Sequence, residues 1–185
     1  EKTSIMFTEK FKEFMGLDDS CITKMIGGCV SVSSVKETLY KVVRDVVCSG
    51  STRPILYIYM NGNGNQVYDT NGDEIMGEMY SGETMKDNMD EVYQLPDGNV
   101  LDDDITDIIQ RGVVESSGCR LLVVLISDHC SSGSMIDKKL VDYDWVSIGS
   151  SLDYEDSYMT GDGNVMTCNL LNVLEKKGDD LKKYS

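Results

Sequence analysis

Apolar and polar positions along the chain alternate between strand-like runs and helix-like stripes. Two runs, residues 55–60 and 121–126, are almost continuously apolar, which is typical of strands in a parallel sheet that is covered on both sides. A further strand is predicted at residues 145–148. Another is predicted at residues 21–26, and it ends at the glycine pair 27–28. The pattern therefore predicts a sheet of several short strands.

Helical periodicity separates these predicted strands. Phe7, Phe11 and Phe14 share one face of a short predicted helix that ends at Gly16. A longer helix is predicted to begin at Ser34, where the capping-box motif S-x-x-E precedes an apolar stripe. Two more helices are predicted, at residues 104–114 and at about residues 167–176.

This alternation predicts an α/β fold with an open, mostly parallel sheet and helices on both of its faces. In such sheets ligands bind at the carboxyl ends of the strands. Two loops rich in small residues follow the two apolar runs, at residues 61–64 and 127–134. The polar and acidic segment 65–104 is too long for a simple connection, and we predict that it is functional or mobile. We therefore expect a functional site at the two loops.

Composition narrows the classes of function. The 185 residues predict a single domain (1–185) with a formal net charge of −15, from 32 acidic and 17 basic side chains. Such a surface repels phosphate backbones and anionic membranes, so we expect no nucleic-acid and no membrane partner. The same charge attracts cations and basic peptides. The sequence contains no apolar run long enough to cross a bilayer and opens on no signal-like segment.

The six cysteines form no C-x-x-C pair and the chain has one histidine, which argues against a structural zinc site. We expect the five cysteines other than Cys130 to be buried, reduced thiols in an intracellular, cytoplasmic protein. Cys130 differs from the other five because it directly follows a predicted buried strand and precedes small residues, as an exposed nucleophile does. The alternative is one more buried thiol.

The order and spacing of motifs over about 100 residues resemble the catalytic core of metacaspases. Metacaspases carry S-G-H-G after one buried strand and D-S-C-H-S-G after the next. Here residues 61–64 read N-G-N-G and residues 128–133 read D-H-C-S-S-G, while residues 69–74, D-T-N-G-D-E, resemble the family's D-T-D-G-D-E. The resemblance implies a caspase-like fold, with a large-subunit-like region at about 1–137 and a small-subunit-like region at about 138–185.

The resemblance also implies roles for four residues. Cys130 falls on the nucleophile, Asn63 on the catalytic histidine, and Gly64 on a backbone position of the oxyanion hole. Asp128 falls on an acid that helps metacaspases hold a substrate lysine or arginine; the alternative is an acid that caps the turn. The departure from the family pattern at position 63 decides what function we expect.

Asparagine cannot take the thiol proton or return it to a leaving amine, as the histidine of a cysteine peptidase does. Losing one member of such a unit typically costs on the order of 10⁴-fold in rate. His129 is adjacent to Cys130, but neighbouring side chains of an extended segment point to opposite faces. We therefore expect His129 to be a core or surface residue and not a substitute base.

Two hypotheses follow. The first is a catalytically impaired, metacaspase-like pseudo-peptidase that binds calcium, or peptide and protein partners with basic residues. The second is an active calcium-dependent cysteine endopeptidase that cleaves after arginine or lysine. The missing histidine favours the first hypothesis, whereas the retention of Cys130, Asp128 and Gly133 argues against a pure scaffold.

Metacaspases commonly depend on Ca²⁺ bound by four aspartates. The matching positions here are all acidic: Asp90, Asp102, Asp103 and Asp137. Calcium takes six to eight oxygen ligands and removes the repulsion between clustered carboxylates. The resemblance therefore implies a calcium site, the alternative being chance matches in an acidic chain. A second candidate, at Asp69, begins like an EF-hand loop but lacks its closing glutamate.

Overall fold

A computed structural model describes residues 2–70, 77–78, 84–85, 89–116, 120–133, 135, 142–152 and 154–181. It divides into two compact units, Val30–Asp156 and the pair of segments Glu1–Cys29 and Ser157–Ser185. The first of these contains all residues of the candidate site that are described below. The boundary at residues 137 and 138 that the resemblance implies is a different division of the chain, and it stays a prediction.

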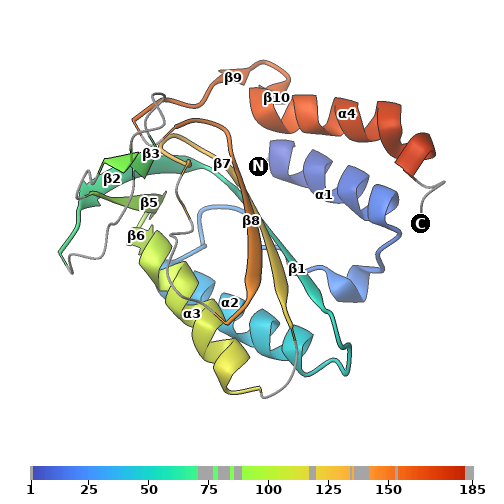
Figure 1. Cartoon of the computed structure of the whole chain (residues 1–185). Helices are drawn as coiled ribbons and strands as arrows, with labels where there is room; N and C mark the ends of the chain where they lie inside the picture. Colours follow the sequence, from blue (N-terminus) through green and yellow to red (C-terminus); the bar gives the residue numbers. More distant parts are fainter. Residues whose placement is uncertain are drawn as a thin grey trace. The chain divides into compact units, whose positions relative to one another are not determined.

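A three-stranded parallel sheet forms the centre of the unit Val30–Asp156 (Figure 1). Its strands are β1 (Ile55–Asn61), β7 (Leu122–Asp128) and β8 (Asp144–Gly149), in the order β1–β7–β8. The two continuously apolar runs are thus adjacent and parallel, as predicted. They pair along their full length because β-branched and aromatic residues favour the extended backbone.

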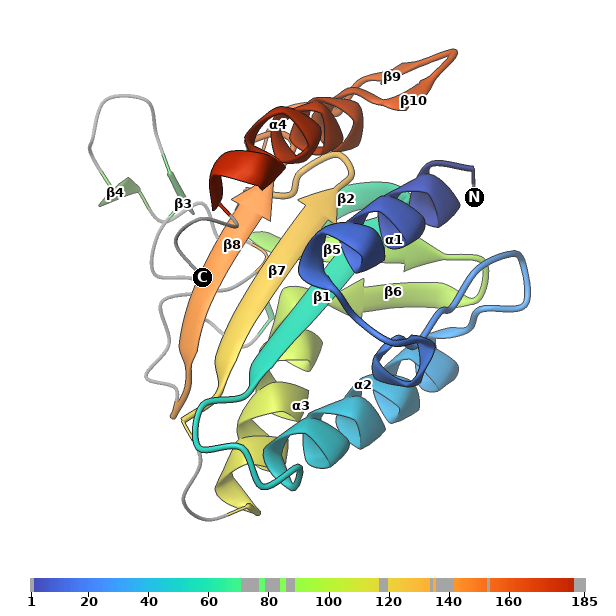
Figure 2. The same ribbon diagram turned by 90° about the vertical axis from the view of Figure 1, so that its right-hand side faces the viewer.

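Helices α2 (Val32–Val47) and α3 (Asp102–Val114) lie side by side on one face of this sheet (Figures 1 and 2). Their apolar stripes and alternate residues of β1 and β7 form the core between the helices and the sheet. The buried members of this core on the four elements are Val43, Val47, Leu56, Met60, Ile105, Ile109, Val113, Val123 and Leu125. The predicted α/β class, with a mostly parallel sheet flanked by helices, is confirmed.

Helix α2 begins earlier than the sequence motif predicted. Its N-cap is Ser31, whose hydroxyl accepts a hydrogen bond from the Ser34 N–H at 3.1 Å. The Ser34 hydroxyl takes the place of the expected acid and accepts from the Ser31 N–H at 2.9 Å. The predicted cap at Ser34 was therefore wrong by one turn, because two serines can close a capping box without a glutamate.

A second, antiparallel sheet in the same unit was not predicted. It contains β2 (Asn63–Tyr68), β5 (Met89–Leu95) and β6 (Gly98–Leu101), in the order β2–β5–β6. Two short strands, β3 (Gly77–Glu78) and β4 (Thr84–Met85), pair with each other. Part of the segment 65–104 is thus ordered sheet and not only a connection.

The other unit contains α1 (Lys2–Met15), the 3-10 helix η1 (Asp19–Cys21), β9 (Met159–Thr160), β10 (Gly163–Asn164) and α4 (Val165–Leu181). Helices α1 and α4 lie side by side and contact each other (Figure 1). Helix α1 ends before Gly16, which has a positive φ of 65°, as predicted from its glycine.

The predicted strand at residues 21–26 was wrong. Only Cys21 belongs to a regular element there, and it ends η1. Residues 22–26 pair with none of the described strands and are half-buried or exposed. Without a ladder partner an alternating pattern does not make a strand.

Strand β8 lies at an edge of the parallel sheet. Among the described strands it pairs with β7 alone. Val146 and Ile148 on this strand are 48% and 38% exposed. In the described part of the chain, no helix is long and apolar enough to span a membrane.

Candidate functional site

The two predicted loops meet at the carboxyl end of the parallel sheet. The register of β1 and β7 pairs Asn61 with Asp128, so the residues after both strands emerge at one edge. A β-carbon on Gly64 would overlap the carbonyl oxygen of Cys130 and the Nδ1 atom of His129. Only glycine allows this approach, and the turn after β1 therefore lies directly against the loop that carries Cys130.

The structure places the predicted site residues at different depths. Cys130 is half-buried in the loop after β7, and Asn63 is exposed at the first position of β2. Asp128 is the last residue of β7 and is 0% exposed. A substrate side chain could therefore reach the Asp128 carboxylate only if this edge of the site opened.

His129 lies in the core of the site; of the two expected alternatives, a core residue or a surface residue, it is the first. It is 1% exposed, and its Nδ1 atom is 2.9 Å from the carbonyl oxygen of Cys130. Because a carbonyl can only accept, Nδ1 carries the proton and the neutral ring presents a bare Nε2. Burial lowers the pKa of His129 below its ordinary value, against a smaller opposing effect of its bond to Cys130 and of Asp128.

Tyr93 on β5 joins the two loops. Its ring is tilted against the His129 ring, with 5.5 Å between centroids, and its hydroxyl donates to the carbonyl oxygen of Asn61 at 2.8 Å. Burial raises the pKa of Tyr93, so the hydroxyl stays protonated and remains a donor at neutral pH. The antiparallel sheet thus supports the end of the parallel sheet.

Three serines hold the backbone of the Cys130 loop from the other side. The hydroxyls of Ser150 and Ser151, just after β8, donate to the carbonyl oxygen of His129 at 3.0 and 3.2 Å. The Ser132 hydroxyl in turn accepts from the N–H groups of Ser150 and Ser151, at 2.9 and 3.3 Å. These bonds link the loop after β7 to the end of β8.

Ser131, directly after Cys130, has a φ of 50°, the only positive value among the described non-glycine residues. A residue with a side chain adopts this conformation only where its surroundings impose it. Here the Ser131 N–H donates to the carbonyl oxygen of Glu155 at 3.0 Å. Such strain is typical of functional loops and supports Cys130 as the centre of the site.

The predicted calcium ligands lie at one end of the β5–β6 pair. The register pairs Val92 with Leu101, which brings Asp90 and the first turn of α3 to the same end. Asp90 and Asp102 are buried, and Asp103 is half-buried. Asp137 lies outside the described residues. The described His, Cys, Asp and Glu side chains form no group of three that could hold a metal ion.

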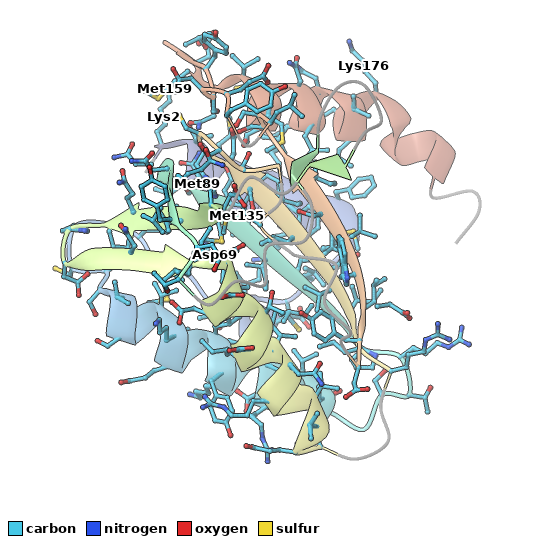
Figure 3. All side chains as sticks on the ribbon, turned by 60° about the vertical axis from the view of Figure 1, so that its left-hand side comes forward. Lys2, Asp69, Met89, Met135, Met159 and Lys176 are labelled. Atoms are coloured by element: carbon cyan, nitrogen blue, oxygen red, sulfur yellow. The ribbon has the colours of Figure 1, made fainter. Side chains whose placement is uncertain are left out.

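Two other acids, Glu91 and Asp69, lie on or next to the β2–β5 pair, close to the predicted calcium ligand Asp90. Glu91 is buried and accepts a hydrogen bond from the Gln66 side chain at 2.9 Å, across the β2–β5 pair. Asp69 follows β2 at the end where Tyr68 pairs with Met89 (Figure 3). The next two positions of the EF-hand-like pattern that Asp69 begins, Asn71 and Asp73, lie outside the described residues.

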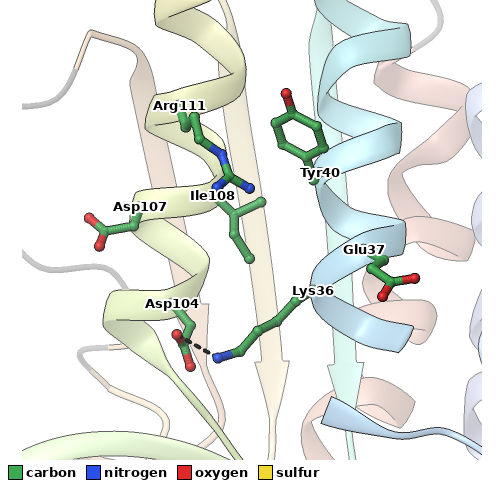
Figure 4. A pocket seen from close by; sticks show the side chains of 7 residues that line it. All are labelled: Lys36, Glu37, Tyr40, Asp104, Asp107, Ile108 and Arg111. Atoms are coloured by element: carbon green, nitrogen blue, oxygen red, sulfur yellow. Dashed lines mark ion pairs between the residues drawn. The ribbon is translucent and has the colours of Figure 1, made fainter. Parts of the chain in front are cut away.

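A groove of about 560 Å³ lies between α2 and α3 and involves none of the predicted site residues (Figure 4). At one end Lys36 pairs with Asp104 at 2.7 Å. At the other end the Arg111 guanidinium lies 4.5 Å from the centre of the Tyr40 ring. Cations and acids alternate along it, as on a solvated helix pair.

Comparison with known proteins points in the same direction as the motifs. No family model matches the chain. Metacaspase-3 of Arabidopsis thaliana is 30% identical over 102 residues, which are 55% of this chain and 25% of that protein. Metacaspase-1A of Neurospora crassa is 29% identical over 106 residues, which are 55% of this chain and 20% of that protein. Just over half of the chain is therefore distantly similar to metacaspases. The chain spans about a quarter or less of the length of these curated relatives.

A solved structure supports the fold alone. The crystal structure of protein GSU0716 from Geobacter sulfurreducens superposes with a TM-score of 0.52 at 20% sequence identity. The superposition covers 78% of this chain and 61% of that protein. The α/β architecture is therefore shared beyond the segment that matches metacaspases, and it is consistent with a caspase-like fold.

Sequence reasoning missed the residues that surround Cys130. Tyr93, Ser150 and Ser151 come from elements that follow or precede Cys130 by about 20 to 40 positions. Their types are common in any polar loop, and no spacing marks them. Only the serine pair directly after a predicted strand, at the sheet edge where ligands bind, could have been noticed.

Proposed function

We propose that this chain is a metacaspase-like protein that binds peptides or protein partners with basic residues at the Cys130 loop but does not cleave them efficiently. The observation that carries the proposal is the state of the chain's one imidazole. His129 is enclosed at 1% exposure and its Nδ1 proton is engaged by the Cys130 carbonyl. Its Nε2 atom, the one ring nitrogen that could take the thiol proton, is buried and accepts a hydrogen bond from no described group. A base for the thiol would have to come from another residue.

The neighbouring position supports the same conclusion. Gly64 lies against the Cys130 carbonyl, and the residue before it is Asn63, where the metacaspase pattern has histidine. The amide side chain of asparagine does not titrate near neutral pH and cannot take up the thiol proton. An unassisted cysteine thiol is only a few per cent thiolate at pH 7. Peptide bond cleavage through Cys130 would therefore be slow.

Calcium is the second part of the proposal. Asp90, Asp102 and Asp103 would supply oxygen ligands, with Asp137 as the fourth acid of the family pattern. The burial of Asp90 and Asp102 supports this, because buried carboxylates are costly unless a cation or hydrogen bonds compensate their charge. Bound calcium would neutralise these carboxylates and order the first turn of α3 against β5.

The formal charge of −15 supports a basic partner. At low salt such a field raises the association rate of cationic peptides and repels acidic ones. The binding arm of the test therefore compares two labelled peptides of the same length, one with arginine and lysine and one with glutamate and aspartate in their place. We expect binding of the basic peptide alone, weakened by salt.

The catalytic arm uses arginine- and lysine-containing peptide reporters, with calcium and with chelator. We expect no measurable cleavage by the native chain and a gain of cleavage in Asn63→His, since that variant supplies a base next to Gly64. The control is Asn63→His combined with Cys130→Ala, which must be inactive. Strong cleavage by the native chain, abolished by Cys130→Ala, would overturn the proposal in favour of an active calcium-dependent peptidase.

A further inference from the structure

The His129 ring is buried beside Cys130, and its hydrogen bonds suggest a role other than that of a catalytic base or a simple core residue. The ring is enclosed between Tyr93 of β5 and the backbone of Gly64. Its one hydrogen bond among the described residues runs to the carbonyl of the next residue, Cys130. The Nε2 atom is buried and has no hydrogen-bond partner among the described residues.

We propose that His129 is a positioning residue for Cys130: its neutral ring, donating from Nδ1, holds the Cys130 carbonyl against the turn after β1 and thereby limits access to the thiol. The inference rests on the proposed function only in taking Cys130 as the reactive group of the site. It adds a means by which the chain itself sets the exposure of that group.

The geometry of the loop explains why one hydrogen bond has this effect. The carbonyl that His129 holds belongs to the peptide bond before Ser131, whose φ of 50° is already strained. On the other side of Cys130, the His129 carbonyl is held by Ser150 and Ser151. Both peptide groups that flank the Cys130 side chain are therefore fixed, and releasing one lets the loop relax from its strained form.

Protonation of the ring opposes this position. A charged ring would carry a second N–H at Nε2, where no described residue accepts it, and buried unpaired donors are costly. The titratable groups around the ring are Asp128 and Cys130 on its own loop and Tyr93 on β5. Acidification should therefore favour an opened loop with the ring in solvent.

The first test reads the ring directly. Because the chain has one histidine, ¹⁵N labelling of histidine gives a single imidazole without assignment. We expect the Nδ1-protonated tautomer at pH 7.5 and no titration near the value of an exposed histidine. The Nε2-protonated tautomer, or titration near pH 6.5, would overturn the proposal.

The second test reads the thiol. Alkylation of Cys130 by iodoacetamide at pH 7.5 is followed by peptide mass mapping. The internal controls are Cys21, Cys29 and Cys48, for which the expected burial was wrong, since all three are exposed. His129→Asn keeps an amide N–H at the position of Nδ1, whereas His129→Phe keeps an aromatic ring and removes the donor. We expect His129→Asn to react within about twofold of the native chain, and His129→Phe roughly three- to tenfold faster, as the loss of one hydrogen bond predicts.

Equal rates in the native chain and both variants would overturn the proposal. Equal acceleration in both variants would show that the ring acts by its shape and not by its donor, and would overturn it as well. If His129→Phe fails to fold, which loss of the native circular dichroism spectrum would reveal, the ring spectrum and His129→Asn still decide. None of these measurements needs peptide binding, cleavage or calcium, so failure of the proposed function would be recognised separately.

Discussion

Gly64→Ala tests the contact on which the whole site depends. The added methyl group would overlap two atoms that cannot swing away, the Cys130 carbonyl oxygen and the ring nitrogen of His129. Both belong to a loop that Ser150 and Ser151 fix by hydrogen bonds. Overpacking of this kind typically costs about 1–3 kcal/mol, and the bond from His129 to Cys130 is worth about 1 kcal/mol if it breaks.

We therefore expect Gly64→Ala to lower the free energy of unfolding by about 2–4 kcal/mol. For a chain of this length that is a fall in melting temperature of roughly 5–15 °C. The measurement is thermal and urea unfolding followed by circular dichroism. Gly28→Ala is the matched control, because it has the same chemistry, meets no atom within 4 Å and keeps an ordinary φ.

The control also reports the gain that any Gly→Ala change makes by restricting the unfolded chain, about 0.4–1 kcal/mol. If Gly64→Ala is as stable as Gly28→Ala, the turn after β1 does not lie against the Cys130 loop in solution. Both the comparison with the metacaspase site and the role of His129 would then lose their geometric basis.

Three further predictions follow from the same region. Ser131→Gly should raise the stability by up to about 1 kcal/mol in urea unfolding by relieving its positive φ, whereas Ser132→Gly should lower it; a loss in both would refute the strain. Millimolar calcium, but not magnesium, should raise the melting temperature by several degrees, about 2.7 kcal/mol at a hundredfold excess over Kd, and Asp102→Asn should abolish this; no shift would refute the calcium site. Burial lowers the folded pKa of His129, so the unfolded chain binds the proton more readily and stability should fall by at most about 1.4 kcal/mol per unit as the pH drops below about 6.5; a native slope equal to that of His129→Asn would contradict this.

The elements that the sequence predicted correctly are those that bury a continuous apolar run or an apolar stripe. The runs at residues 55–60 and 121–126 can be buried only in a sheet, and the stripe of α2 has one face to bury, so their neighbours followed. Strand β2 could not be predicted in this way. Its six residues include three polar amides and a glycine, and it is a strand because β5 pairs with it.

Some features of the candidate site could likewise be predicted from the sequence, and others could not. That two loops would meet followed from the parallel strands, because the carboxyl ends of such strands share an edge. The enclosure of His129 did not follow, because it depends on Tyr93 and on a backbone approach at Gly64 that only the folded chain displays. Alternation along an extended segment had suggested only that His129 and Cys130 point apart. It could not show that the ring would turn back to the Cys130 carbonyl.

The negative charge of the chain opposes association between copies through the exposed edge strand β8. An edge strand with Val146 and Ile148 exposed is a template for pairing with another copy, and natural proteins protect such edges with charge. The charge of −15 provides that protection by keeping copies apart, but ions screen it over about 10 Å at 0.1 M salt and about 3 Å at 1 M. Colloidal stability should therefore fall as ionic strength rises, so that a dilute, low-salt buffer is the condition in which association between copies of this chain is weakest.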